Sequence, residues 1–291
     1  MKIKDIIEIM RPINDVMGSF TVIIGILNTR TSVSAPIIIT NIILGVLVYF
    51  FIAGSGMVIN DIYDLSIDQI NRPNRPIPSG RISLKQAKIL FIATLAIGIV
   101  IAILNSVINS LGFLNVIIAA IFGFIGWIYA KWGKKSGFPG NIIVSVSFTI
   151  GLVYGAVLNG WNVPVYIIYF FLTSFFLLLA REIIKGCEDV EGDEKEGVKT
   201  LALTVGLKKA MIVSETCQIL SIIFFILPTF TSIINPLLFL ITMCFGLIVV
   251  FCAFVLSLLS KLKKEEFGRI SLLLKIGALL GLVAFICASI G

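Results

Sequence analysis

Long apolar runs separated by short polar connections dominate the chain. Nine runs are long enough to cross a hydrocarbon core of roughly 30 Å as helices: 13–29, 36–59, 86–105, 111–130, 141–159, 163–184, 208–227, 236–259 and 270–290. Residues 1–11 are amphipathic and lack the cleavage site of a signal peptide, so we expect the first helix to be retained. The pattern predicts an all-α, polytopic membrane protein in which residues 1–291 form one domain of nine transmembrane helices.

The composition agrees with a membrane location and excludes several kinds of chemistry. The chain is 58% hydrophobic and 13% charged, whereas soluble domains are about half apolar and a quarter charged. Histidine is absent, which excludes imidazole ligands, a histidine base and Ser-His-Asp triads. The five cysteines lack metal-ligand spacing, and we interpret them as packing residues. We expect Gly151/Gly155 and Gly277/Gly281 to allow close helix packing.

The basic residues predict how the chain is oriented. With these spans, all of the 23 Lys and Arg except Arg30 lie before the first span, or in and beside the connections after the even-numbered spans. The positive-inside rule makes that side cytoplasmic. We therefore predict a cell-membrane protein with a cytoplasmic N-terminus and active site and an external C-terminus. The net charge of +7 either attracts anionic headgroups and phosphorylated substrates or reflects topology alone. Nothing in the sequence points to nucleic acid or to an obligate protein partner.

Two polar segments on the cytoplasmic side, 60–85 and 185–199, are the candidates for function. In the first, Asp61, Asp64 and Asp68 stand at i, i+3 and i+7, so on a helix they would form one stripe able to share hard divalent cations. The two segments resemble each other, because each runs from an acidic helix end to a glycine and a Lys-x-Ala sequence. A pseudo-repeat would let two helix ends face one cavity, although so short a similarity also arises by chance.

The second segment carries Lys185, Asp189 and Asp193 at intervals of four residues, so one helical face would present an ammonium and two carboxylates. An exposed, self-paired helix end would explain one such cluster. Two clusters on the same side favour a metal site, because carboxylates near hydrocarbon repel one another unless a cation or water compensates. Oxygen ligands without histidine or thiolate select Mg²⁺, which substrate phosphates commonly share.

Basic residues on the same side complete the chemistry that the acids suggest. They are Arg72, Arg75, Lys131, Lys134, Lys135 and Lys185. Mg²⁺ and cationic side chains around a diphosphate stabilise a leaving group, and apolar helices suit a hydrocarbon tail. Heterolysis of an allylic diphosphate in a dry pocket is therefore the reaction that we expect.

These motifs resemble the signatures of the UbiA superfamily of intramembrane prenyltransferases. The matching segments are Asn-Asp-x-x-Asp-x-x-x-Asp at 60–68, Asn-Arg-Pro-x-Arg-Pro-Ile-Pro-Ser-Gly at 71–80 and Lys-x-x-x-Asp-x-x-x-Asp at 185–193. The resemblance implies a nine-helix bundle whose central cavity opens to lipid and is capped by two polar cytoplasmic loops. It also implies two Mg²⁺ bound by Asp61, Asp64, Asp68, Asp189 and Asp193 with support from Asn60, a diphosphate held by Arg72, Arg75 and Lys185, and Asn14 in the same pocket.

Residues 181–193 most resemble the archaeal branch of the superfamily, which joins a geranylgeranyl group to geranylgeranylglyceryl phosphate and makes the second ether bond of membrane lipids. The resemblance implies a prenyl diphosphate and a lipid phosphate, both drawn from the bilayer, as substrates. Arg181 stands where many quinone-type relatives have Tyr, which suits an acceptor phosphate. Gly186 stands where many relatives have Asp, so a supporting carboxylate is missing unless Glu188 or Glu191 substitutes.

Two other functions stay open on the sequence. A prenyltransferase for a quinone precursor or haem would use the same fold, and a cation-coupled transporter would also place acids at helix ends. Transporters keep polar sites near the bilayer midplane, whereas we expect only Glu215 to lie deeper in a span. For prenyl transfer, we expect the attacked oxygen to lose its proton late, to pyrophosphate or a loop carboxylate, without a strong base.

Overall fold

The computed structural model describes residues 2–109, 112–195 and 197–291, and every regular element in these ranges is helical. The side chains of Ile13, Asn14, Met17, Lys134, Lys135, Glu191 and Lys195 lie outside the described part. The α-helices are α1 (Ile3–Met10), α2 (Pro12–Asn28), α3 (Ala35–Tyr63), α4 (Leu65–Asn71), α5 (Leu84–Asn109), α6 (Leu114–Lys131), α7 (Phe138–Thr149), α8 (Gly151–Val157), α9 (Val165–Glu188), α10 (Val190–Lys195), α11 (Leu201–Val205), α12 (Leu207–Ile226), α13 (Pro236–Leu259) and α14 (Lys264–Cys287). Short 3-10 helices are η1 (Arg30–Ser32), η2 (Gly133–Ser136) and η3 (Leu227–Phe230).

The apolar helices confirm a polytopic membrane protein. Within the described ranges, 7 helices are long and apolar enough to cross a membrane: α3, α5, α6, α9, α12 with η3, α13 and α14. A bent pair, α7 with α8, raises the number to 8, so length and composition support fewer crossings than the sequence predicts. The first predicted span, 13–29, forms α2, whose apolar part, Gly18–Asn28, is shorter than the others.

The span expected at 141–159 is two helices, α7 and α8, which are bent by 40° where they meet. In α7, Ser145 Oγ donates to Asn141 O at 2.8 Å, and Thr149 Oγ1 donates to Ser145 O at 2.8 Å. Hydrogen bonds from side chains back to the preceding turn bend helices. Beyond the bend, α8 packs against α2.

Glycines allow α8 to approach α2 closely. A methyl group at Gly155 would lie 2.1 Å from Val22 O, and one at Gly151 would lie 1.9 Å from Thr21 Oγ1. This pair therefore has the packing role that its spacing predicts. In the second predicted pair, a methyl group at Gly277 would lie 2.6 Å from Val250 Cγ2, so this glycine has the predicted role. A methyl group at Gly281 would meet its nearest neighbour at 3.9 Å, which is an ordinary contact.

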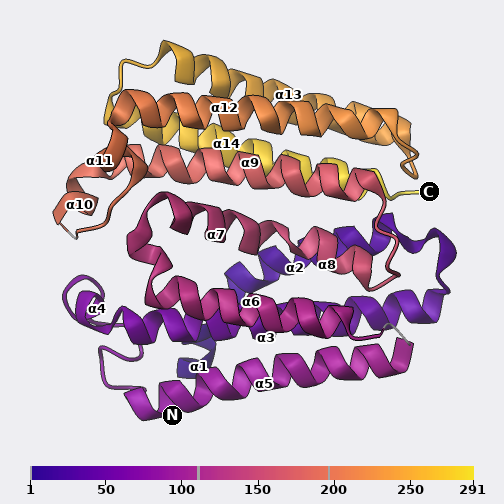
Figure 1. Cartoon of the computed structure of the whole chain (residues 1–291), viewed down its shortest axis with the longest axis horizontal. Coiled ribbons are helices and arrows are strands. Elements are labelled where there is room, and N and C mark those ends of the chain that lie inside the picture. Colours follow the sequence, from indigo (N-terminus) through magenta and orange to yellow (C-terminus); the bar gives the residue numbers. More distant parts are fainter. Residues whose placement is uncertain (1, 110–111, 196) are drawn as a thin grey trace.

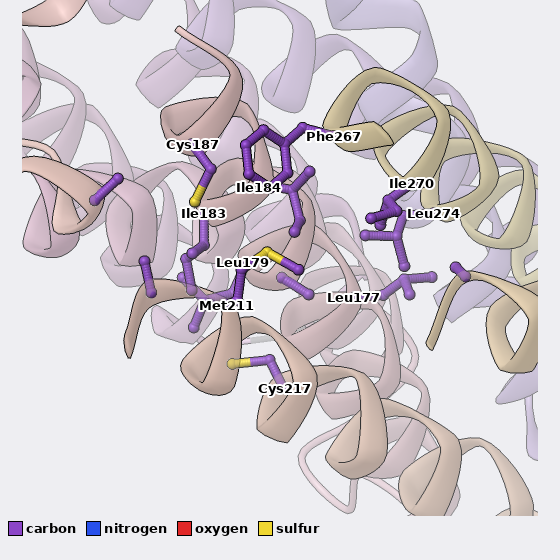
Figure 2. Packing of buried hydrophobic residues seen from close by; sticks show 14 of the residues in the cluster. Leu177, Leu179, Ile183, Ile184, Cys187, Met211, Cys217, Phe267, Ile270 and Leu274 are labelled. Atoms are coloured by element: carbon purple, nitrogen blue, oxygen red, sulfur yellow. The ribbon is translucent and has the colours of Figure 1, made fainter. Parts of the chain in front are cut away.

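Figure 1 shows the long helices in two groups. One group contains α9, α12, α13 and α14, the other contains α3, α5 and α6, and α2, α7 and α8 lie between them. In the first group, buried side chains from α9, α12 and α14 converge, among them Ile183, Met211 and Phe267 (Figure 2). A separate cluster that includes Val48 and Ala119 holds α3 against α6.

The two ends of the bundle differ in character. The short helices α4 and α10, which follow the two acidic helix ends, lie at the same end (Figure 1). This placement agrees with the expectation that both polar segments face one side. At the opposite end, Arg30 binds the carbonyl oxygens of Ser289 and Gly291, the latter at 2.7 Å, and so ties the α2–α3 connection to the C-terminus.

We expect Gly155→Ala to lower the unfolding temperature of the detergent-purified protein, because the added methyl group forces α8 away from α2. Overpacking of this kind costs about 1–3 kcal/mol. The matched control is Gly281→Ala, whose methyl group fits and whose helix gains about 1 kcal/mol of intrinsic propensity. Thermal unfolding followed by circular dichroism compares the two variants, and equal midpoints would contradict the close approach of α2 and α8.

Candidate functional site

A cavity of about 460 Å³ lies among α2, α3, α6, α7, α8 and α9. Its wall follows α3 from Val48 to Asn60, which is about 18 Å of helix. Near Asn60 the wall is polar, and nearer Val48 it is apolar. The polar end includes Arg11, Arg181, Glu182 and Lys185, and the apolar part includes Ile52, Ile118, Ala119 and Phe122. The cavity therefore suits an amphiphile with an anionic head and a hydrocarbon tail.

Three carboxylates form a buried acidic group beside this polar end. Asp61, Asp64 and Asp68 are 2%, 5% and 4% exposed. Arg11 binds Asp61, and Arg75 Nη1 lies 2.5 Å from Asp68 Oδ2 and 3.3 Å from Asp61 Oδ1. The two guanidinium groups offset the mutual repulsion of the carboxylates. Arg75 is thus beside the site as expected, and its contacts in the structure are to the acids.

The three acids do not share one uninterrupted helix. α3 ends at Tyr63, Asp64 forms the junction with φ −83° and ψ 0°, and α4 begins at Leu65. The Asp64 amide still donates to Asn60 O at 2.9 Å, and the Asp68 amide donates to Asp64 O at 2.8 Å. These helical hydrogen bonds keep the carboxylates together through the junction.

The second motif contributes Arg181 and Lys185 to the cavity wall. Glu182 lies 3.1 Å from Arg181 Nη1 and 3.5 Å from Lys185 Nζ. Asp189 follows the end of α9 and is exposed, whereas Asp193 on α10 is partly buried. In the part of the chain that the structure describes, no three His, Cys, Asp or Glu side chains gather closely enough to hold a metal ion together. Both motifs therefore lie at one end of the bundle without forming a single cluster of five carboxylates.

The other predicted phosphate ligands lie away from the cavity wall or outside the described residues. Arg72 is exposed at the end of α4. Lys131 is exposed too, and its Nζ lies 5.0 Å from the centroid of the Trp127 ring, a cation–π contact. For Asn14, Lys134 and Lys135, the side chains lie outside the described part of the structure.

The oxygen donors at the polar end fit a hard cation such as Mg²⁺. Asn60 Nδ2 donates to Asp64 Oδ2 at 2.9 Å. The other amide atom, Asn60 Oδ1, is buried and has no hydrogen-bond partner in the described structure. An amide oxygen beside buried carboxylates, without nitrogen or sulfur ligands, is a donor set that Mg²⁺ prefers.

Arg81 fastens the polar loop after α4 to α1. Its Nη1 donates to Asp5 Oδ1 at 2.7 Å and to Glu8 Oε2 at 2.7 Å, and its Nη2 donates to Asn74 O at 2.6 Å. The hydrogen bond from Arg81 holds the pKa of Glu8 below its ordinary value, and the same bond raises the pKa of Arg81. Because this loop also carries Arg75, the anchor helps to hold Arg75 against the acidic group.

The sequence pattern did not single out several polar residues of the cavity wall. Asp15 and Tyr154 are 1% and 4% exposed, and neither the Asp15 carboxylate nor the Tyr154 hydroxyl has a hydrogen-bond partner in the described structure. An ionisable residue inside an apolar span is itself a functional signal, and Asp15 within span 13–29 carried that signal. Arg11 was interpreted only as part of the N-terminal lead-in, because its contact with Asp61 depends on the turn between α1 and α2.

Comparison with known sequences identifies similar proteins along the whole chain. A model of the UbiA prenyltransferase family matches residues 19–273. A digeranylgeranylglyceryl phosphate synthase from Saccharolobus solfataricus is 37% identical, with 100% of this chain and 98% of that protein covered. Another, from Methanosphaera stadtmanae, is 35% identical, with 96% of this chain and 97% of that protein covered.

Solved structures agree with the helical arrangement. A structure of digeranylgeranylglyceryl phosphate synthase in membranes has a TM-score of 0.85 at 33% identity and covers 98% of each chain. A UbiA homologue from Archaeoglobus fulgidus bound to GPP and Mg²⁺ has a TM-score of 0.69 at 19% identity, covering 97% of this chain and 99% of its own. The second likeness shows the fold alone.

We expect Arg81→Ala to loosen residues 72–83 at neutral pH, because the loop loses its bonds to α1. Acidification should loosen the wild-type loop in the same way. The folded-state pKa of Glu8 is lowered, so Glu8 stabilises the anchor above its ordinary pKa of 4.5 and loses this effect as the pH falls through the folded value. Hydrogen exchange of the loop, corrected for its intrinsic pH dependence, measures both changes.

The control for this anchor is Lys85→Ala, which removes another exposed cation close to the loop. Its loop protection should equal that of the wild type at neutral pH. Loop protection that is unchanged in Arg81→Ala would contradict the anchoring role of Arg81.

Proposed function

This chain belongs to the UbiA prenyltransferase family, and we propose that it transfers a geranylgeranyl group from geranylgeranyl diphosphate to the hydroxyl of geranylgeranylglyceryl phosphate. The reaction forms the second ether bond of an archaeal lipid and releases pyrophosphate. This is the activity for which relatives matching 96% or more of the chain are named. The structural observation that carries the proposal is the amphiphilic cavity, which is cationic at one end and apolar along α3.

The polar end of the cavity would bind both phosphate-bearing groups. Arg11, Arg75 and Lys185 would hold the prenyl diphosphate, because Arg11 and Lys185 line the polar end and Arg75 lies beside it, against Asp61 and Asp68. Arg181 would bind the phosphate of the acceptor, since its Nε is buried without a hydrogen-bond partner in the described structure. Further contributors to phosphate binding would be Asn14, Arg72, Lys131, Lys134 and Lys135.

The acidic residues would hold Mg²⁺. The proposed ligands are Asp61, Asp64, Asp68, Asp189 and Asp193, with the amide oxygen of Asn60 in support. When bound, Mg²⁺ would neutralise the charge that develops on the departing pyrophosphate. Arg11 and Arg75 keep the first acidic group assembled, because Arg11 binds Asp61 and Arg75 binds both Asp61 and Asp68.

The apolar part of the cavity would enclose the prenyl tail. Val48, Ile52 and Phe122 present hydrocarbon along this part of the wall. Burying the tail would also exclude water from the reacting carbon. In dry surroundings, an allylic cation reacts with the positioned glycerol hydroxyl instead of with solvent.

The proposed arrangement in the membrane places the acidic end of the bundle at the cytoplasmic face. Nine crossings result if α2 and the bent pair α7–α8 are added to the 7 long helices. An odd number of crossings puts the two termini on opposite sides of the membrane, and the positive-inside rule would then place the N-terminus in the cytoplasm and the C-terminus outside. In Figure 1 the C-terminus does lie at the opposite end from α4 and α10. Residues 1–291 would then act as one catalytic domain.

Asp61→Ala and Asp189→Ala should each lower the turnover of labelled geranylgeranyl diphosphate by about 100-fold or more. The expected size follows from the several kcal/mol that a metal ion contributes to the transition state. Chelation of Mg²⁺ should have the same effect on the wild type. Glu265→Ala, which removes an exposed acid on α14, is the control and should keep full turnover. Undiminished turnover in both aspartate variants would contradict the assignment of Asp61 and Asp189 as Mg²⁺ ligands.

The identity of the acceptor is tested by the mass of the product. With geranylgeranylglyceryl phosphate, 4-hydroxybenzoate and haem b offered separately, we expect only the lipid phosphate to gain a geranylgeranyl group. Arg181→Leu should raise the KM for this acceptor about tenfold, as expected when one charged hydrogen bond is lost. A prenylated aromatic product, or an unchanged KM in Arg181→Leu, would contradict the proposed acceptor site.

A further inference from the structure

We propose that Asp15 on α2 is the catalytic residue that binds the hydroxyl of the acceptor and takes its proton. The inference rests on the proposed transfer reaction and adds a base that the sequence did not predict. Both carboxylate oxygens of Asp15 are buried and have no hydrogen-bond partner in the described structure, and the residue is 1% exposed. The same residue lines the cavity.

A buried carboxylate without a partner is costly for a folded protein. Leaving such a group unsatisfied costs about 1–3 kcal/mol or more. Buried acids that serve only the fold have partners, as Asp5 does with Arg81. An acid that forgoes this stabilisation while facing a cavity is therefore better explained by a ligand that supplies the missing hydrogen bond.

The nearby cation is directed elsewhere. Arg11 lies one turn before Asp15, but its Nη2 binds Asp61 and its Nη1 lies 3.7 Å from Met57 Sδ. Tyr49 also lines the cavity, and its hydroxyl donates to Ser147 O at 3.2 Å.

Two other polar residues of the cavity wall, Tyr154 and Glu182, differ from Asp15 in charge or in pairing. Tyr154 lines the same cavity, and its buried hydroxyl has no hydrogen-bond partner in the described structure. Glu182, the other acid among the described lining residues, is paired with Arg181 and Lys185. Among the described lining residues, Asp15 is thus the acid whose oxygens have no hydrogen-bond partner.

Asp15 lies deeper in the membrane-spanning bundle than Asp61, at the level where the first prenyl carbon would lie. A methyl group at Gly54 would lie 3.4 Å from Asp15 Oδ2, so the carboxylate borders α3 at Gly54. Gly54 precedes Asp61 by seven residues, which is about 10 Å along the helix axis. A diphosphate held at the level of Asp61 therefore extends its first prenyl carbon inwards, towards the level of Asp15. The acceptor hydroxyl must reach that carbon.

The proposed transfer needs no reactant besides the prenyl diphosphate and the acceptor. The C1–O bond to the diphosphate breaks, and its electron pair leaves with pyrophosphate. The acceptor oxygen forms the new C1–O bond, and its proton passes to an oxygen of Asp15. Release of the proton to water at the polar end of the cavity restores the carboxylate. General bases of this kind contribute about 100-fold or more to a rate.

The test measures two products in one reaction containing labelled geranylgeranyl diphosphate, geranylgeranylglyceryl phosphate and Mg²⁺. One product is the ether lipid, and the other is geranylgeraniol, which forms when water captures the prenyl group. We expect Asp15→Asn to lower ether formation about 100-fold while geranylgeraniol formation stays within about twofold. Its unfolding temperature should equal or exceed that of the wild type, because an unpartnered charge is removed. The control is Asp5→Asn, a buried acid paired with Arg81 outside the cavity, which should keep the wild-type product ratio.

If Asp15→Asn does not fold, Asp15→Ala tests the same role. Asp15→Ala leaves room for a small carboxylate, so added formate should restore ether formation whereas formamide should not. Wild-type ether formation in Asp15→Asn, a parallel loss of both products, or no rescue by formate would overturn the role of Asp15. A wild-type protein that makes no ether lipid would instead overturn the proposed function, so the two failures are distinguishable.

Discussion

Acidic side chains at the ends of apolar helices need cations to compensate them, and this requirement organises the functional end of the molecule. Asp61 and Asp68 are buried, and the positive charges of Arg11 and Arg75 stabilise them there. Each arginine reaches the acids from a different segment, Arg11 from the turn before α2 and Arg75 from the loop after α4. The ion pairs therefore join the N-terminal turn, α3 and the polar loop around one end of the cavity.

The cavity has an apolar part and a polar end because its helices change from apolar to polar side chains along their length. α3 contributes hydrocarbon at Val48 and Ile52 and an amide at Asn60, so one helix passes from the tail region to the head region. α9 adds Arg181 and Lys185 at the same polar end. A prenyl diphosphate and a lipid phosphate both have this division into head and tail. The proposed reaction therefore follows from the division of the cavity into a polar and an apolar part, which matches the phosphate heads and hydrocarbon tails of these substrates.

Much of the architecture was predictable from the pattern of residues. Apolar runs located the long helices, because a backbone in hydrocarbon must satisfy its own hydrogen bonds. The likeness between the two polar segments extends to geometry, since Gly80 and Gly206 both adopt positive φ, at 76° and 88°, shortly before or at the start of the next helix. The bend between α7 and α8 was not predictable from hydropathy, because hydrogen bonds from Ser145 and Thr149 do not change the apolar character of the run.

The sequence by itself determined the helical membrane class, the acidic and basic motifs and their location at one end of the bundle, since spacing and hydropathy are local properties of the chain. Tertiary structure decided which charges meet. The contact of Arg11 with Asp61 spans fifty residues, and the lack of a hydrogen-bond partner for Asp15 depends on what α3 places beside it, where Gly54 borders its carboxylate. Burial and pairing arise between helices that are distant in sequence, so only the folded chain distinguishes an ion-paired acid such as Asp61 from one without a hydrogen-bond partner, such as Asp15.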